Sequence, residues 1–527
     1  MDARRLGARA AADLLLSGLS LTGEHLKPGR NAARFCFTGC VCGRLKPAIH
    51  DIQYGSMISR GVSASFHRHL FLAALLAAIL NFIAFYPGIL HHDAWAYFAA
   101  ARNGDFTNWQ PPLLGKMWVP LQAIWNGPQP MLVLFMAGYW SGFVLLARAF
   151  EAEGGKIAAC TFAAGLFPLA LNFNGQLVKD IGMAVCLLLA AGCAAALVRG
   201  AIKKRAATLG AMWLFLVMGA FMRANALFAL PPLLDLAGIA TSRYWAKTGW
   251  LKRGIAVCLV SLALAPAHIL ADRHVFRVND IHPISQLQMF DIGGISYFSG
   301  IDRFQGFFGP DFVTKNRTCY TPFHWDVYGW GGCEEVYEKL KPQFGWPLSK
   351  MWLTALAADP VSYLAHRLAH FNRFLQFVCG DCKQMIYTGS QSTNQHEFTF
   401  TPTFLYEAID WASEAINDSP FGRPYVWLAL CLAWLLAAFA IPHPLTRRIT
   451  LTMTASGALY ALAFAVVGIA SDYRYIYWTM LCGLIATPAV AARVIMRRDA
   501  PAWLRFGPLA GIFIVIALRE IAVRAMP

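Results

Sequence analysis

Apolar runs of about 20 residues recur along this chain, and they limit its fold more than any other feature. A helix of that length crosses the hydrocarbon core of a bilayer, which is about 30 Å thick. Of the 527 residues, 57% are hydrophobic and 14% are charged, whereas soluble domains carry about 25% charged residues. The sequence therefore predicts an all-α polytopic membrane protein rather than several soluble domains.

The apolar runs predict about eleven transmembrane helices. They lie near residues 70–88, 130–150, 157–172, 179–199, 208–222, 225–240, 253–271, 424–441, 449–470, 474–492 and 504–522. Pro231 and Pro232 are expected to interrupt the sixth run. The segment 208–240 is therefore either two spans or one broken re-entrant hairpin.

Basic residues cluster in the loops between alternate runs, near Arg60, Lys203, Arg243, Arg447 and Arg493. If the first span runs from inside to outside, all of these loops and the segment around Glu151 lie on the same side of the membrane. Cytoplasmic loops carry an excess of Lys and Arg, so we expect the N-terminus inside and the C-terminus outside. The net charge of +16 then reflects loops that face anionic lipid, and binding of nucleic acid is not expected.

This topology divides the chain into four segments. They are a basic N-terminal segment (1–65), a transmembrane core (66–271) with a first outer loop (89–118), a mixed extracytoplasmic insert (272–423) and C-terminal transmembrane helices (424–527). A short basic stretch and the first span follow Met57, which predicts that translation starts there. Residues 346–357 and 361–378 of the insert have the periodicity of amphipathic surface helices.

Polar side chains gather in the segments that are predicted to lie outside. The first outer loop carries His92, Asp93 and Tyr97 on an amphipathic helix. Further groups at the outer ends of later spans are Lys179, Asp180, Arg223, Asn225, Asp291, Asp472 and Arg474. Ionisable groups near membrane depth are costly unless they face a partner or a cavity, so their common side favours a shared site. The alternative is that Asp93 caps its helix and that the basic residues anchor spans at the interface.

These residue types suggest a chemistry. Arg223, Arg474 and Lys179 suit a phosphate or diphosphate, and Asp93 is the candidate general base for an incoming hydroxyl. The other polar residues of the set would support the site or contact substrate. Aromatic residues of the insert suit sugar rings. The sequence contains no phosphate-binding P-loop, dinucleotide fingerprint or H-E-x-x-H motif, which argues against a nucleotide-driven pump and a zinc protease.

Short motifs follow one another in order along the predicted outer face. Asp93 is followed by the pattern Y…A…G…W-x-P-P, and later by L-V-K-D, F-M-R-A-N-A-L, D-I-G-G-I-S and S-D-Y-R-Y. This order resembles the membrane glycosyltransferases of the GT-C type. That group includes the glycosyltransferase family 39 (protein O-mannosyltransferase-like) enzymes and the lipid A aminoarabinose transferases. The resemblance covers about residues 66–500 and looks like a bacterial branch of the superfamily.

The resemblance implies a polyprenyl-phosphate sugar donor, inversion at the anomeric carbon and Asp93 as the catalytic carboxylate. It also implies a lipid, glycan or protein acceptor, and an active site on the periplasmic face of the bacterial cytoplasmic membrane. Many relatives carry an Asp-Glu pair in the first loop, whereas Ala94 follows Asp93 here. The role of a divalent metal ion is therefore open. His91, His92 and Asp93 are possible ligands, but adjacent residues on a helix do not all point one way.

The insert also carries four cysteines, Cys319, Cys333, Cys379 and Cys382. An even number in an oxidising compartment predicts two disulfides, with three possible pairings.

Two other functions remain compatible with the sequence. A secondary transporter would have repeated halves and broken helices, and only Pro231 and Pro232 suggest such a break. A lipid-linked polysaccharide polymerase or ligase would work in the same compartment with a different donor.

Overall fold

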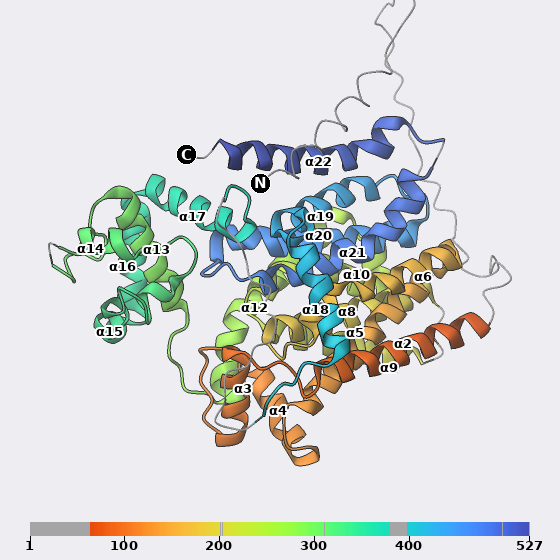
Figure 1. Cartoon of the computed structure of the whole chain (residues 1–527), viewed down its shortest axis with the longest axis horizontal. Coiled ribbons are helices and arrows are strands. Elements are labelled where there is room, and N and C mark those ends of the chain that lie inside the picture. The colour runs from red at the N-terminus through yellow and green to blue at the C-terminus, as the bar shows by residue number, and fades with distance from the viewer. Residues whose placement is uncertain are drawn as a thin grey trace, which may run out of the picture. The chain divides into compact units, whose positions relative to one another are not determined.

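The computed structural model describes residues 64–200, 202, 204–309, 311–379, 398–497 and 499–525. The chain divides into two compact units, Met1–Ile58 and Ser59–Pro527. The first unit, and with it the predicted start at Met57, lies outside the described residues. Most helices of the second unit are labelled in Figure 1.

Eight helices in the described part of the chain are long and apolar enough to cross a membrane. They are α2 (Ala64–Phe85), α5 (Gln129–Phe150), α8 (Lys179–Arg199), α9 (Arg205–Met222), α12 (Trp250–Ala271), α20 (Pro444–Val467), α22 (Ala502–Arg524) and the continuous helix Tyr473–Ile495, in which α21 (Tyr477–Val490) is flanked by η7 (Tyr473–Ile476) and η8 (Ala491–Ile495). The described residues form no β-strand, only three isolated bridges. The predicted class, an all-α membrane protein, is confirmed.

Three further apolar segments are shorter or bent. α6 (Gly155–Ala163), continued by η2 (Ala164–Leu166), meets α7 (Pro168–Asn174) at an angle of 56°. α10 (Ala226–Thr241) and α19 (Pro424–Ala438) have 16 and 15 residues. Each apolar run of the sequence overlaps one of these segments or one of the eight long helices.

The helix α10 continues through Pro231 and Pro232, so the prediction that these prolines interrupt it is wrong. α10 packs against α8, α9, α12 and α20. Proline is tolerated inside a transmembrane helix where neighbouring helices and local adjustment satisfy the backbone groups that it frees. The segment 208–240 therefore consists of two separate helices, α9 and α10, rather than a helix broken at the prolines.

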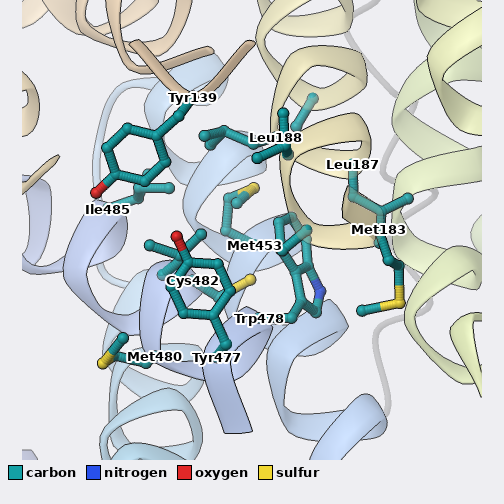
Figure 2. Packing of buried hydrophobic residues seen from close by; sticks show 14 of the residues in the cluster. Tyr139, Met183, Leu187, Leu188, Met453, Tyr477, Trp478, Met480, Cys482 and Ile485 are labelled. Atoms are coloured by element: carbon teal, nitrogen blue, oxygen red, sulfur yellow. The ribbon is translucent and has the colours of Figure 1, made fainter. Parts of the chain in front are cut away.

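The helix α8 forms the centre of the bundle and packs against α5, α9 and α10. Of its most apolar stretch, 83% is buried, against 11% for α12 and 6% for α22, so those two helices present apolar side chains outward. Figure 2 shows Met183 and Leu188 of α8 beside Trp478 of α21. Glycine allows close approach: a Cβ on Gly142 of α5 would lie 2.5 Å from Leu188 Cγ. Small residues at contacts are typical of helix packing in lipid.

Acidic and basic residues from several helices meet at one end of the bundle, which we call the basic end. Glu151 pairs with His67 of α2 at 2.7 Å and with Arg199 of α8 at 2.8 Å. Glu153 pairs with Arg493 at 2.5 Å. Three of the segments predicted to lie on the cytoplasmic side, around His67, Arg199 and Arg493, are thus in direct contact with the segment around Glu151.

The segments that were predicted to lie outside contact one another at the opposite end, the loop end. Thr107 of the first outer loop forms a parallel bridge with Asn279 of the insert, and His324 of the insert forms an antiparallel bridge with Ala470. The helix α8 separates the two ends, because its 21 residues at 1.5 Å each span about 30 Å.

The insert 272–423 was predicted to have mixed structure, but its described residues form helices and loops without a strand. α13 (Ile284–Ser299) lies in a second hydrophobic core that also contains the Cys319–Cys333 disulfide. The two predicted amphipathic helices are present as α16 (Trp346–Ala358) and α17 (Pro360–Leu375). Their exposed apolar side chains include Trp346, Leu353, Val361, Leu364 and Leu368.

The shorter elements complete the described fold. They are α3 (His92–Asn103), α4 (Leu113–Ile124), η1 (Glu151–Glu153), α11 (Arg243–Lys247), η3 (Asp272–Phe276), α14 (Phe312–Cys319), η4 (Trp325–Tyr328), α15 (Glu335–Leu340), η5 (Lys341–Gln343), α18 (Phe404–Asn417), η6 (Pro420–Gly422), η7 (Tyr473–Ile476) and η8 (Ala491–Ile495).

Cysteine labelling tests which end faces outward. Asn279→Cys should react with a membrane-impermeant maleimide added to intact cells, whereas Lys204→Cys should react only after permeabilisation. Both positions are exposed, and the loop end is predicted to face out because the basic loops face in. The parent chain, with its native cysteines, sets the background. Labelling of Lys204→Cys in intact cells would contradict this orientation.

Candidate functional site

Six charged side chains come together at the loop end. They are Asp93, Lys179, Asp180, Arg223, Asp472 and Arg474. Each lies at a helix terminus, where a side chain can reach past the apolar bundle. Asp93 is in the first turn of α3, Lys179 and Asp180 open α8, Arg223 directly follows α9, and Asp472 and Arg474 lie at η7. Four segments far apart in the sequence therefore contribute to one cluster.

The guanidinium of Arg474 is the hub of this cluster. Its Nη2 lies 2.6 Å from Asp93 Oδ2, and its Nε lies 3.0 Å from Asp472 Oδ2 and 3.6 Å from Asp180 Oδ2. Its Nη1 donates to His91 Nε2 at 2.7 Å. All three guanidinium nitrogens thus have partners within the protein.

The side chain of Arg223 pairs with Asp180 and lies over the ring of Tyr475, with 4.2 Å between its Cζ and the ring centroid. The side chains of Arg223 and Asp180 are only 9% and 1% exposed. A buried charge without a partner costs several kcal/mol, on the order of 3–5 when one partner of a pair is removed. The two residues therefore depend on each other.

The amide of Gln110 connects Asp93 to Lys179. Gln110 Nε2 donates to Asp93 Oδ1 at 3.3 Å, and its Oε1 accepts hydrogen bonds from Lys179 Nζ and, at 3.2 Å, from the Tyr97 hydroxyl. Gln110 was not among the predicted site residues, although it is the variable residue of the W-x-P-P motif. That position was the signal that could have identified it.

The side chain of Asp93 does not cap its helix. The N-cap of α3 is His91, and it makes no side-chain capping bond. Asp93 is instead held by Arg474 and Gln110. The alternative explanation from the sequence, a helix cap with no other partner, is therefore wrong.

In the cluster three carboxylates face three basic side chains. Burial raises the pKa of Asp93, but the charges of Arg474 and Lys179 lower it by more, so this pKa lies well below its usual range. Burial and Arg474 lower the pKa of His91 to about 4, so its imidazole is neutral at pH 7. A carboxylate held in this way is a weak base. In this arrangement Asp93 is engaged in charge pairing with Arg474.

The insert brings two further titratable groups near Asp93. Asp326 and His324 lie 3.6 Å apart, Oδ2 to Nδ1. Burial raises the pKa of Asp326, the charge of His324 lowers it and that of Asp93 raises it, and the resulting pKa is above the usual range. The backbone between them is fixed because Trp325 N donates to Ile469 O at 2.8 Å. The sequence around these residues carries no motif that would have singled them out.

Two predicted site residues lie at the margin of the cluster. His92 is exposed at the start of α3, and it is close enough to lower the pKa of Asp326. Asn225 occupies the N-cap of α10 without a side-chain capping bond. No interaction in the described part of the chain joins the side chain of Asn225 to the six charged groups.

The predicted site residue Asp291 lies in the insert core and is fully buried. Its carboxylate contacts Arg367 and lies 3.3 Å from His366 Nε2. Arg367 Nη1 in turn donates to Gly468 O at 2.7 Å. Gly468 begins the loop that leads to Arg474. Asp291 is therefore not a member of the cluster and is linked to it through Arg367 and this loop.

The insert cysteines are partly accounted for. Cys319 is bonded to Cys333, and Cys379 is also disulfide-bonded. Cys382 lies outside the described residues.

No group of three His, Cys, Asp or Glu side chains within the described ranges is arranged to hold a metal ion. His91 turns toward Arg474 and His92 is exposed, so these two do not form a ligand set with Asp93. The structure thus identifies no residues for the divalent ion that the sequence left open.

Comparison with known proteins gave no relative: no family model, curated protein or solved structure matches this chain. The resemblance to the GT-C glycosyltransferases therefore remains a prediction.

Removal of the Asp291 carboxylate tests its role as a buried partner. Asp291→Ala would leave Arg367, which is 3% exposed, without its charge partner. We expect a loss of about 3–5 kcal/mol in the free energy of unfolding, measured as a lower melting temperature in detergent. Glu335→Ala, which removes an exposed partner of Lys315, is the control and should change little. Equal melting temperatures for the Asp291→Ala variant and the parent would contradict the buried pairing.

Proposed function

We propose that this protein is a membrane glycosyltransferase that moves a sugar from a polyprenyl-phosphate-linked donor to an acceptor hydroxyl. One observation carries this proposal. Asp93, Lys179, Arg223 and Arg474, which the sequence suggested as a base and as phosphate ligands, converge from four segments at one end of the bundle. Such a transfer needs a carboxylate as general base and, beside it, cations that bind the phosphate.

The proposed reaction uses these groups as follows. The acceptor hydroxyl attacks the anomeric carbon, and Asp93 takes its proton. The bond between the anomeric carbon and the phosphate oxygen breaks, and its electron pair leaves with the polyprenyl phosphate. Arg474, Arg223 and Lys179 stabilise the charge of that phosphate. Attack opposite the leaving group inverts the anomeric centre.

The proposal includes a topology with about eleven spans, a cytoplasmic N-terminus and the cluster on the periplasmic side of a bacterial inner membrane. It is supported by the common position of the basic loops at one end and of the outer segments at the other. Nucleotide sugars are not available outside the cytoplasm, so a lipid-borne donor follows from this orientation. The acceptor would be a lipid, a glycan or a protein. A lipid-linked polysaccharide polymerase or ligase would differ in its donor.

A secondary transporter is a second candidate, and one observation favours it. The segment from α6 to α7 bends by 56°, and Phe173 of α7 stacks on Tyr473 of η7 with 5.6 Å between the ring centroids. Transporters bind substrate at broken helices. Buried ion pairs also occur along transport pathways. Uptake of substrate into proteoliposomes, rather than sugar transfer, would support this reading.

Substitution of Asp93 tests the proposed base. Asp93→Asn keeps the shape of the side chain and its bond to Gln110, but it removes the proton acceptor. We expect transfer from polyprenyl-phosphate sugars to fall by about 10²–10⁴-fold, measured with purified protein and a panel of labelled donors. The melting temperature in detergent reports separately on folding.

Asp105→Asn is the matched control, because Asp105 lies in the same loop and is exposed. It should leave transfer unchanged. A fully active Asp93→Asn variant would remove Asp93 as the base. A parent protein without transfer from any polyprenyl-phosphate sugar would contradict the proposed function itself.

A further inference from the structure

Every nitrogen of the Arg474 guanidinium already lies next to a group of the protein. Its Nη2 is paired with Asp93, its Nε with Asp472 and Asp180, and its Nη1 with His91. The cluster already holds three carboxylates beside its three basic side chains, so an incoming phosphate adds negative charge to a largely buried group of ions. A phosphate that binds Arg474 therefore competes with its present partners for the guanidinium.

Asp472 and Asp180 are both held independently of their contact with the Arg474 guanidinium. Asp472 accepts a hydrogen bond from the backbone N–H of Arg474 at 3.1 Å through its other oxygen, Oδ1, and so belongs to the same turn. Asp180 is 1% exposed and pairs with Arg223 as well. If Asp180 moved away, the buried charges of Asp180 and Arg223 would both lose their partner. Neither carboxylate is easily displaced.

Of the three carboxylates beside Arg474, Asp93 is the one that lies neither in the turn of Arg474 nor in a buried pair with a second arginine. Its side chain is 20% exposed, and besides Arg474 it has the 3.3 Å hydrogen bond from Gln110. It lies on α3, a helix of 12 residues outside the long helices of the bundle. A phosphate that takes its place on the Arg474 Nη2 would restore the charge-assisted hydrogen bond that Asp93 gives up.

We infer that a phosphate headgroup exchanges with Asp93 on Arg474, so that ligand binding releases the carboxylate from its ion pair. This inference rests on the proposed function, because it assigns to Asp93 a second role, as the group that competes with the donor phosphate. Release from Arg474 removes the larger of the two positive charges that make Asp93 a weak base. The base then becomes effective only when donor is bound, which ties deprotonation of the acceptor to the presence of its reaction partner.

The exchange makes an unusual prediction for binding. Asp93→Asn should bind undecaprenyl phosphate tighter than the parent does, by about 10-fold or more, because the competing charged hydrogen bond is gone. Asp93→Ala should do the same, which guards against an effect peculiar to the Asn side chain. Dissociation constants are measured with purified protein in nanodiscs, and melting temperatures confirm that each variant is folded. A parallel series with inorganic phosphate distinguishes a lipid-linked headgroup from free phosphate as the ligand.

Two controls define the outcome. Asp105→Asn removes one negative charge from the same loop and should leave the dissociation constant unchanged, so that a general electrostatic effect is separated from local competition. Arg474→Lys should weaken binding, because the guanidinium fork is lost.

Equal or weaker binding by both Asp93 variants would overturn the exchange while leaving the proposed function standing. If neither the parent nor any variant binds undecaprenyl phosphate or inorganic phosphate, the exchange and the donor class of the proposed function both fall.

Discussion

The structure of the loop end depends on the cancellation of charge around Arg474. Charged groups at membrane depth persist when they are paired and hydrogen-bonded, and here one guanidinium pairs with carboxylates from α3, α8 and its own turn. Because these carboxylates lie on different elements, the pairing also joins the first outer loop to the helix bundle. The insert completes this arrangement through Arg367, which holds the loop before Arg474.

Much of the architecture follows from apolar patterning. A run near 20 residues requires a helix in lipid because no water is present to satisfy its backbone, and every such run overlaps a helix. The same patterning misjudged α10, because local rules for proline do not include the neighbouring helices that compensate for it. The helical character of the insert was also only partly anticipated. α16 and α17 follow their periodicity, whereas the loops between its helices depend on tertiary contacts.

The site residues could be predicted from the sequence only because charged residues are rare in an apolar chain and therefore stand out. Asp93, Asp180, Arg223 and Arg474 stand out because an ionisable group at the end of a span needs a partner. Asp291 stands out for the same reason, yet its partner is Arg367 in the insert core, and sequence alone does not distinguish one partner from another. Gln110 and Asp326 were missed because polar residues in a loop are common and only the fold brings them to Asp93.

The central claim is that charged residues from separate segments form one ion cluster at the loop end. A double-mutant cycle on the most buried pair tests it most directly, with Asp180→Asn, Arg223→Gln and the double variant compared by thermal unfolding in detergent. If the two side chains are partners, the double variant should be more stable than the sum of the single losses implies, by about 0.5–3 kcal/mol. Additive losses would mean that Asp180 and Arg223 do not interact, and that the cluster does not exist in the folded protein.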